Sequence, residues 1–463
     1  MIKTLPSRAT LIALAAVVIF ALSPVSVMAE SIADPVTPSL SSSGASMAYA
    51  QRLIDTGRFE EALKILQSLP PGDLSTIEAL FLLGLTSLEV ASRETAEDRK
   101  NALLDQTITA FRSILTNNPG LVRVRLELAR AFFLKGDDDL SRENFERALA
   151  GNPPPVVAAN IRYFLTLIRQ RRRWSSYFGI SLAPSTNINA ASENDTVYIF
   201  GLPFRFGEES GSKSGIGVNI WTGGEYQYPL GDKIRLRTGG SISRQDYAAK
   251  SFDRTTISAH IGPRLLTGPD TEFSILANVR MNLTAGRRYN RETGPSLEII
   301  HRPTRSLQID GRLSRYERSF RTQKHLDGYQ TVLGLGGTYI ASPTVRLEGM
   351  ANYIWEQTEA ERWRNATRRF RLGTSIALPR GFTLGIGGEI QRVRYKGQWL
   401  PFVLDGSSRR DSIWQLDISL FNRAFTIGGF SPQLFVAREV RSSNAQLYDY
   451  RRTRAEMRVV RQF

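Results

Sequence analysis

The stretch Trp414-Gln-Leu-Asp-Ile-Ser-Leu420 has an apolar side chain at every second position and a polar side chain at each position between them. Because successive side chains of a β-strand point to opposite faces, this segment has one apolar and one polar face. The same alternation recurs in Phe273–Leu283, Val345–Glu356 and Phe382–Gln391. When one face meets hydrocarbon and the other meets water, alternate polar groups cost little, so the pattern predicts a transmembrane β-barrel.

Residues 174–463 contain fourteen such segments, which predicts a 14-stranded antiparallel barrel. An even number returns both ends of the barrel to the same side of the membrane. The segments centre near residues 180, 222, 239, 259, 278, 298, 311, 334, 350, 372, 388, 417, 434 and 457.

The connections between these segments alternate in length, which orients the predicted barrel. One set is short and rich in Pro and Gly, which suits periplasmic turns: Pro229–Asp232, Thr267–Asp270, Arg302–Arg305, Ala341–Thr344, Leu378–Gly381 and Asn422–Phe425. The other set is longer and polar, which suits extracellular loops: 186–214, 246–252, 284–293, 317–328, 358–368, 396–411 and 440–450.

The first residues of the chain have the composition of a secretory signal peptide. A short basic region precedes an apolar stretch of twelve residues, 11–22, and small residues lead to a cleavage site between Ala29 and Glu30. We therefore expect a signal peptide over 1–29 and a flexible leader over 30–47, with a retained N-terminal anchor as the alternative. The chain has no cysteine, so it holds no disulfide and is not itself a lipoprotein.

Residues 48–173 show helical periodicity and a repeat. Phe111-Arg-Ser-Ile-Leu-Thr-Asn-Asn-Pro119 recurs 34 residues later as Phe145-Glu-Arg-Ala-Leu-Ala-Gly-Asn-Pro153, and Gly136 supplies a tight turn between them. A period of 34 is that of tetratricopeptide repeats, which stack into a concave surface for extended peptides or proteins. We predict a small periplasmic helical domain that binds a protein substrate, with an unrelated helical bundle as the alternative.

The positive charge belongs to the predicted barrel. The chain has a formal charge of +16, but residues 30–173 hold 18 basic and 18 acidic residues. Residues 174–463 hold 40 basic and 26 acidic residues, an excess of 14. Nucleic acid is therefore not an expected partner, and we expect a positive lumen and a positive rim beside anionic outer-membrane lipid.

The chain ends on Phe463, on the same alternation as the apolar residues of the last predicted strand. A terminal aromatic at this place is the usual recognition signal for the outer-membrane barrel assembly machinery, which we expect as a partner.

This order of segments resembles the surface lipoprotein assembly modulator family, the outer-membrane component of type XI secretion. Two stretches carry the resemblance beyond architecture: 118–153, with Pro119, Gly136, Phe145 and Pro153, and 183–191, with Pro184, Asn187 and Asn189 at the start of the barrel. The resemblance implies the translocation or surface display of specific partner proteins, either surface lipoproteins or secreted soluble proteins. The helical domain would contact the substrate and the barrel would be its exit route.

No group of residues in the sequence forms a recognisable catalytic, cofactor or metal site. The three histidines are scattered: His260 is predicted to line the lumen, His301 to lie near a strand end and His325 to lie in an outer loop. We therefore expect a protein that is not an enzyme. Two other functions stay open, a passive porin for small solutes with a preference for anions, and an exopolysaccharide exporter.

Overall fold

The computed structural model describes residues 42–463 except 172, 193–195, 200–201, 206–210, 269, 305, 400–405, 423–424, 426–429 and 463. The predicted signal peptide with its cleavage site at Ala29 and Glu30, most of the leader, and Phe463 lie outside the described residues.

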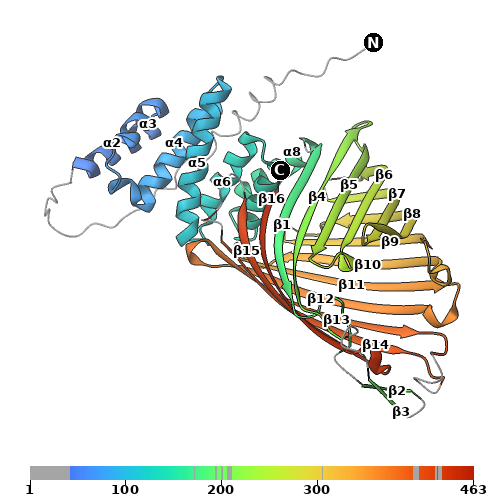
Figure 1. Cartoon of the computed structure of the whole chain (residues 1–463). Helices are drawn as coiled ribbons and strands as arrows, with labels where there is room; N and C mark the ends of the chain where they lie inside the picture. Colours follow the sequence, from blue (N-terminus) through green and yellow to red (C-terminus); the bar gives the residue numbers. More distant parts are fainter. Residues whose placement is uncertain are drawn as a thin grey trace. The chain divides into compact units, whose positions relative to one another are not determined.

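The described N-terminal region is helical, as the periodicity predicts (Figure 1). Its helices are α2 (Ser42–Asp55), α3 (Phe59–Gln67), α4 (Ile77–Arg93), α5 (Glu97–Asn117), α6 (Val122–Lys135), α7 (Asp138–Leu149) and α8 (Pro155–Arg171). Gly57 follows α2 with φ of 77°, and Gly136 ends α6 with φ of 87°. Glycine adopts this left-handed conformation without the steric cost of a Cβ, which explains the tight turns at both positions. No described helix is both long enough and apolar enough to cross a bilayer.

The two phenylalanines of the 34-residue repeat lie in the hydrophobic core of the helical region. Phe111 on α5 is fully buried against Gly84 of α4, where an added Cβ would lie 2.6 Å from the Phe111 ring. Phe145 on α7 is also fully buried and stacks on Phe164 of α8, with ring centroids 5.2 Å apart. The repeat therefore marks equivalent core positions, while its assignment to the tetratricopeptide class stays a prediction.

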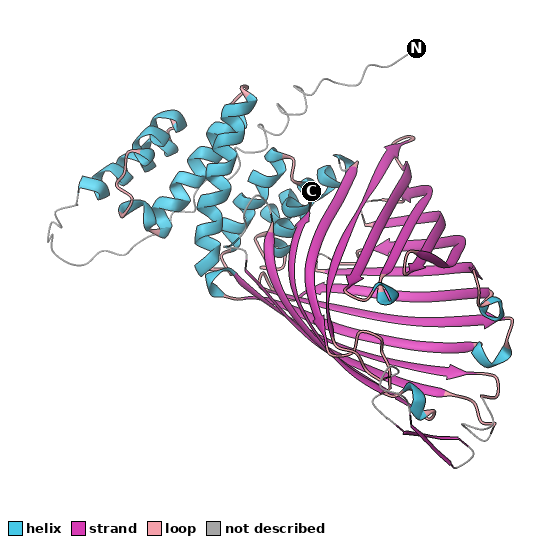
Figure 2. Cartoon of the chain, in the orientation of Figure 1, coloured by secondary structure: helices cyan, strands magenta, loops and turns pink. Residues whose placement is uncertain are grey.

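In the described part of the chain, fourteen antiparallel strands form one closed barrel, in which the first strand pairs with the last. Figure 2 draws the barrel strands in magenta. They are β1 (Trp174–Ser185), β4 (Gly215–Pro229), β5 (Ile234–Tyr247), β6 (Arg254–Leu266), β7 (Thr271–Thr284), β8 (Arg287–His301), β9 (Leu307–Phe320), β10 (Gly328–Ile340), β11 (Val345–Thr358), β12 (Asn365–Ala377), β13 (Phe382–Tyr395), β14 (Arg410–Asn422), β15 (Ser431–Ser443) and β16 (Tyr450–Gln462). The predicted number of barrel strands is confirmed.

Two features of the barrel differ from the sequence interpretation. The predicted loop 284–293 is wrong, because β7 and β8 are joined by a tight turn at Ala285 and Gly286, both with positive φ. The strand ends here are polar on both faces, so the alternation that marks a membrane strand is lost although pairing continues. The first long loop also contains a two-stranded hairpin that was not predicted, β2 (Thr196–Ile199) and β3 (Leu202–Arg205).

Candidate functional site

The inward-facing side of the barrel is crosslinked by arginine–carboxylate pairs. Arg237 of β5 lies 2.7 Å from Glu225 of β4 and 3.0 Å from Glu298 of β8. The Nε2 atom of His260 lies 3.2 Å from Oε2 of the same Glu225, so the histidine predicted to line the lumen belongs to this network. Charge-assisted hydrogen bonds of this kind hold the side chains against neighbouring strands.

A second set of pairs continues around the inner wall. Arg318 of β9 contacts Glu292 of β8 at 3.3 Å and Glu356 of β11 at 2.9 Å. Arg371 of β12 donates two hydrogen bonds of 2.8 and 2.9 Å to the carboxylate of Asp417 on β14. Because these inward-facing arginines are paired with carboxylates, their positive charges are neutralised locally.

The loop ends of the strands are covered by a cluster centred on Arg409, which is only 2% exposed. Its Nε and Nη2 atoms donate hydrogen bonds of 3.0 and 2.8 Å to the buried carboxylate of Asp411. Its guanidinium carbon lies 3.2 Å from the ring centroid of Tyr448, and Arg441 also pairs with Asp411. Removal of either charge would leave its partner buried with fewer contacts, which makes this pair costly to break.

Aromatic rings join this arginine to the neighbouring loops. The ring of Trp399, 2% exposed, lies 4.9 Å from Trp363, 5.8 Å from Tyr395 and 5.6 Å from Tyr448. Trp363 in turn lies 6.3 Å from the imidazole of His325. Four loops, β9–β10, β11–β12, β13–β14 and β15–β16, therefore meet in one group, which we call the loop cluster: His325, Trp363, Trp399, Arg409 and Tyr448.

Inward-facing residues at the strand ends beside the loop cluster are buried. Thr367, Val393 and Asp411 point inward at the loop ends of β12, β13 and β14, yet all three are buried. Burial also raises the pKa of the Tyr448 hydroxyl, so this side chain stays neutral at physiological pH. Sequence reasoning missed this cluster, and the available signal was the presence of Trp363 and Trp399 in otherwise polar loops.

A recurring aspartate contact stiffens three of the loops. Each of η4 (Lys250–Phe252), η5 (Lys324–Leu326) and η9 (Gln446–Tyr448) is a single helical turn followed directly by an aspartate. The carboxylates of Asp253, Asp327 and Asp449 accept hydrogen bonds from the backbone N–H groups of Tyr247, Phe320 and Ser443, at 2.9, 2.6 and 2.5 Å. These N–H groups lie at the ends of β5, β9 and β15, so each aspartate ties its loop to the strand before it.

The barrel-start residues Asn187 and Asn189 close the base of the first loop. Asn187, 1% exposed, donates to the carbonyl oxygens of Ala191 at 2.9 Å and Arg451 of β16 at 3.4 Å, and accepts from the Ala191 N–H at 3.1 Å. Asn189 donates to Gly211 at 2.8 Å and accepts from the Lys213 N–H at 2.9 Å. Both residues act on backbone groups, so their role here is to position the loop.

Replacing Asn187 by alanine should loosen the first loop without unfolding the barrel. The change removes the hydrogen bonds of the buried Asn187 amide to two backbone carbonyls and one N–H group, and each lost hydrogen bond contributes about 0.5–1.5 kcal/mol. We expect faster protease cleavage within 186–214 in purified protein. Ser192→Ala is the matched control, because Ser192 lies in the same loop and its hydroxyl donates an exposed hydrogen bond to the Gln446 carbonyl oxygen. Equal cleavage of both variants would contradict a positioning role for Asn187.

The other predicted site residues have structural positions. Pro184 lies in β1, where pairing with β16 runs through Leu182 and resumes at Ser185, because proline has no N–H to donate. The Pro119 carbonyl accepts a hydrogen bond from buried Arg125 in the helical region, and Pro153 lies just before α8. His301 contacts Thr271 at 2.8 Å. Among the described residues, no three His, Asp or Glu side chains are arranged to hold a metal ion.

Comparison with known proteins identifies the family. The family model described as surface lipoprotein assembly modifier matches residues 174–463. Surface lipoprotein assembly modifier 1 of Haemophilus influenzae is 22% identical over 381 residues, covering 80% of this chain and 76% of that protein. Surface lipoprotein assembly modifier 1 of Neisseria meningitidis is 24% identical over 365 residues, covering 76% of this chain and 71% of that protein.

Among solved structures, the outer membrane channel DcaP of Acinetobacter baumannii is similar at a TM-score of 0.39 and 10% identity, covering 63% of this chain and 97% of that chain. This likeness is too low to compare individual strands or loops. The family match covers the whole barrel and the closed barrel is that of an outer-membrane protein, so the chain belongs to the surface lipoprotein assembly modifier family and resides in the outer membrane.

Proposed function

We propose that this chain is a non-catalytic outer-membrane translocator that exports or displays specific partner proteins on the cell surface, with surface lipoproteins as the first candidates. The observation that carries the proposal is a barrel of the surface lipoprotein assembly modifier family preceded by a helical region with its own core. The relatives named for surface lipoprotein assembly match over 80% and 76% of this chain, which is more than the barrel alone.

The proposed orientation places the helical region in the periplasm and the loop cluster outside the cell. The chain leaves α8 at Arg171 and enters β1 at Trp174, so the helical region joins the barrel at the end that carries the short turns. Short turns are typical of the periplasmic end of outer-membrane barrels. In this orientation the helical region meets the substrate before the barrel does.

A passive porin fits the loop cluster less well. Buried aromatic and charged side chains from four loops pack together at the loop end of the barrel, whereas a porin has an open water-filled channel. A translocator needs a mouth that stays closed when no substrate is present. The proposal therefore predicts low conductance of the purified protein in planar bilayers.

Deleting residues 48–173 should abolish surface exposure of a genetically neighbouring lipoprotein substrate in co-expressing cells, because the proposed contact surface is lost. Surface exposure is measured by protease accessibility on whole cells, and barrel insertion by the gel mobility of unheated and heated outer membranes. Deletion of residues 30–41 alone is the control and should leave display intact. Unchanged display with the helical region removed would overturn the proposal.

A further inference from the structure

Three arginines lie on the membrane-facing surface of the barrel, close to the loop ends of β12 and β13. Arg368 and Arg392 are paired partners across the two strands, and Arg394 lies opposite Ala366 one step nearer the loops. All three lie on the same face of their strands as Phe370 and Ile390, which are 56% and 54% exposed on the lipid-facing side. The guanidinium groups are thus directly next to the apolar band.

The three arginines differ from the inward-facing arginines of the same strands in their ion pairing. Among the described residues, none of the three arginines forms an ion pair with a carboxylate, whereas the inward-facing arginines of the same strands, Arg369 and Arg371, both do. A charge on the lipid face of a barrel is tolerated near the interface and costly near the midplane. Three adjacent cations at the interface therefore favour an anion supplied by the membrane itself.

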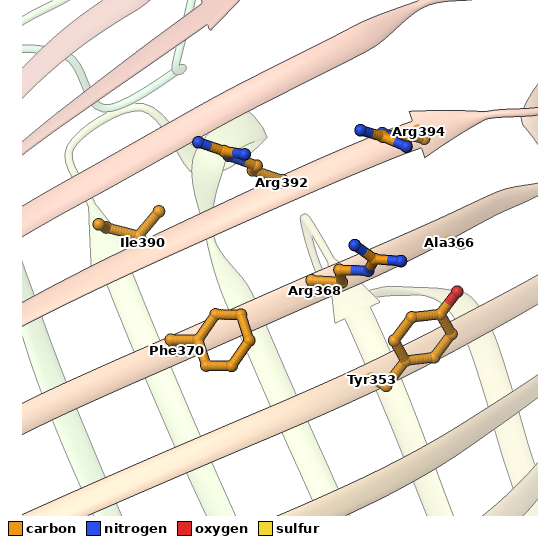
Figure 3. Close-up of a pocket in the computed structure, with 7 residues that line it drawn as sticks. All are labelled: Tyr353, Ala366, Arg368, Phe370, Ile390, Arg392 and Arg394. Atoms are coloured by element: carbon orange, nitrogen blue, oxygen red, sulfur yellow. The ribbon is translucent and has the colours of Figure 1, made fainter.

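The arginines line a cavity of about 480 Å³ together with Tyr353, Ala366, Phe370 and Ile390 (Figure 3). Its loop-proximal part carries Arg368, Arg392 and Arg394, and its deeper part carries Phe370 and Ile390. The Arg368 guanidinium lies 5.7 Å from the ring centroid of Tyr353, which holds it beside the opening. The cavity is therefore amphipathic, with cations toward the loops and apolar side chains toward the membrane interior.

A second hollow lies beside this cavity, with Trp355 opposite Ala366 in the β11–β12 register, and it also combines an arginine with aromatic rings. It is lined by Arg315, Tyr329, Thr331, Trp355 and Gln357, and Arg315 lies 4.8 Å from the ring centroid of Tyr329. Aromatic rings at this depth are typical of the interfacial girdle of a barrel. Arg410 lies opposite Arg394 in the β13–β14 register and extends the basic surface on the other side.

The short-turn ends of the same strands present apolar side chains on the lipid face instead. Leu347 of β11, Ile376 of β12, Leu384 of β13 and Leu420 of β14 occupy these positions. On the lipid-facing positions of these strands, the arginines thus lie toward the loop end, and this surface matches an anionic headgroup layer on that side of the membrane.

We propose that this cavity binds the phosphorylated sugar headgroup of an outer-leaflet glycolipid of the lipid A type, with its acyl chains along Phe370 and Ile390. The proposal rests on the orientation proposed above, in which the loops face outward. Guanidinium groups bind phosphate oxygens through paired N–H donors, and several adjacent guanidiniums match a headgroup with more than one phosphate. A lipid held here would contact the strands that lead into the β11–β12 and β13–β14 loops of the loop cluster.

The test uses the full-length protein in detergent and measures lipid binding by native mass spectrometry, with lipid A bearing two phosphates, dephosphorylated lipid A, phosphatidylglycerol and inorganic phosphate as probes. The triple variant Arg368→Gln, Arg392→Gln, Arg394→Gln should bind the phosphorylated lipid at least tenfold more weakly than the wild type. The matched control Lys250→Gln, Arg321→Gln, Arg362→Gln also removes three loop-end positive charges, but none of these residues lines the cavity, and it should bind normally. The wild type should prefer phosphorylated over dephosphorylated lipid A.

Equal binding by the triple variant and the control would overturn the proposal, as would equal binding of the two forms of lipid A. Stronger binding of phosphatidylglycerol, the inner-leaflet type of lipid, or saturation by inorganic phosphate alone would also overturn it. If the triple variant fails to fold, Arg392→Gln alone should still bind the phosphorylated lipid more weakly than the wild type, and unchanged binding by this single variant would overturn the proposal. Display of a lipoprotein by the wild type is scored separately, so failure of the lipid site and failure of the proposed function give different results.

Discussion

Replacing Gly262 of β6 by alanine should prevent most of the protein from forming a folded barrel. An added Cβ at this position would lie 1.9 Å from the carbonyl oxygen of Ile275 on β7. Because this oxygen belongs to the backbone, the clash can be relieved only if β7 or β6 moves. The β6–β7 ladder opens here, between the pairs Ile261–Ala277 and Arg264–Ser274, because Pro263 has no N–H to donate. Forcing extra volume into such a contact costs about 1–3 kcal/mol or more.

Gly294 of β8 is an independent copy of this arrangement. It precedes Pro295, and an added Cβ would lie 2.0 Å from the Arg315 carbonyl oxygen on β9. Gly294→Ala should therefore fail in the same way, while Gly388→Ala on β13, where no atom lies within 4 Å of an added Cβ, should assemble normally. The folded fraction is read from the gel mobility of unheated outer membranes. Normal assembly of the Gly262 and Gly294 variants would show that the strands can shift at little cost.

Replacing Arg409 by methionine should open the loop end of the barrel while leaving the membrane strands folded. The substitution keeps an unbranched side chain but removes the cation between Asp411 and Tyr448. Loss of one member of a buried ion pair costs about 3–5 kcal/mol, because the remaining charge stays buried with fewer contacts. We expect the loop cluster to lose its packing and the conductance in planar bilayers to rise.

Arg321→Met is the matched control for this experiment, because Arg321 is an exposed arginine in the β9–β10 loop. It should leave the conductance and the protease sensitivity of the loops unchanged. Asp411→Asn should reproduce part of the Arg409 effect, since it removes the opposite charge of the same pair. If the conductance of the Arg409 variant equals that of the wild type, the loop cluster does not close the mouth.

The strand pattern could be predicted from the sequence because each strand of a membrane barrel contacts lipid on one face and water on the other, and this requirement acts on every strand separately. Each strand must be apolar toward hydrocarbon and polar toward the lumen. The two faces of Trp414–Leu420 can therefore be identified from this segment alone, whatever strands lie beside it. The prediction was wrong at 284–293, where both faces of the strands are polar and this local constraint is absent. In the helical region, the repeat likewise identified Phe111 and Phe145, which the structure places in the core.

The loop cluster could not be predicted, because its contacts join residues from separate loops. Trp363, Trp399 and Tyr448 meet only after β11 to β16 have closed side by side and aligned their ends. Burial of Arg409 depends on those rings and on Asp411, and no spacing in the sequence encodes this arrangement.

The sequence by itself determined the number of barrel strands, the face that each presents to lipid, and the position of the basic excess in residues 174–463. Alternation sufficed for this, because side-chain direction in a strand has a period of two. Only the tertiary structure decided which of those charges are neutralised. Register places Arg371 beside Asp417 on the inner face, and it places Arg368 beside Arg392 on the outer face, where no carboxylate pairs with either in the described residues.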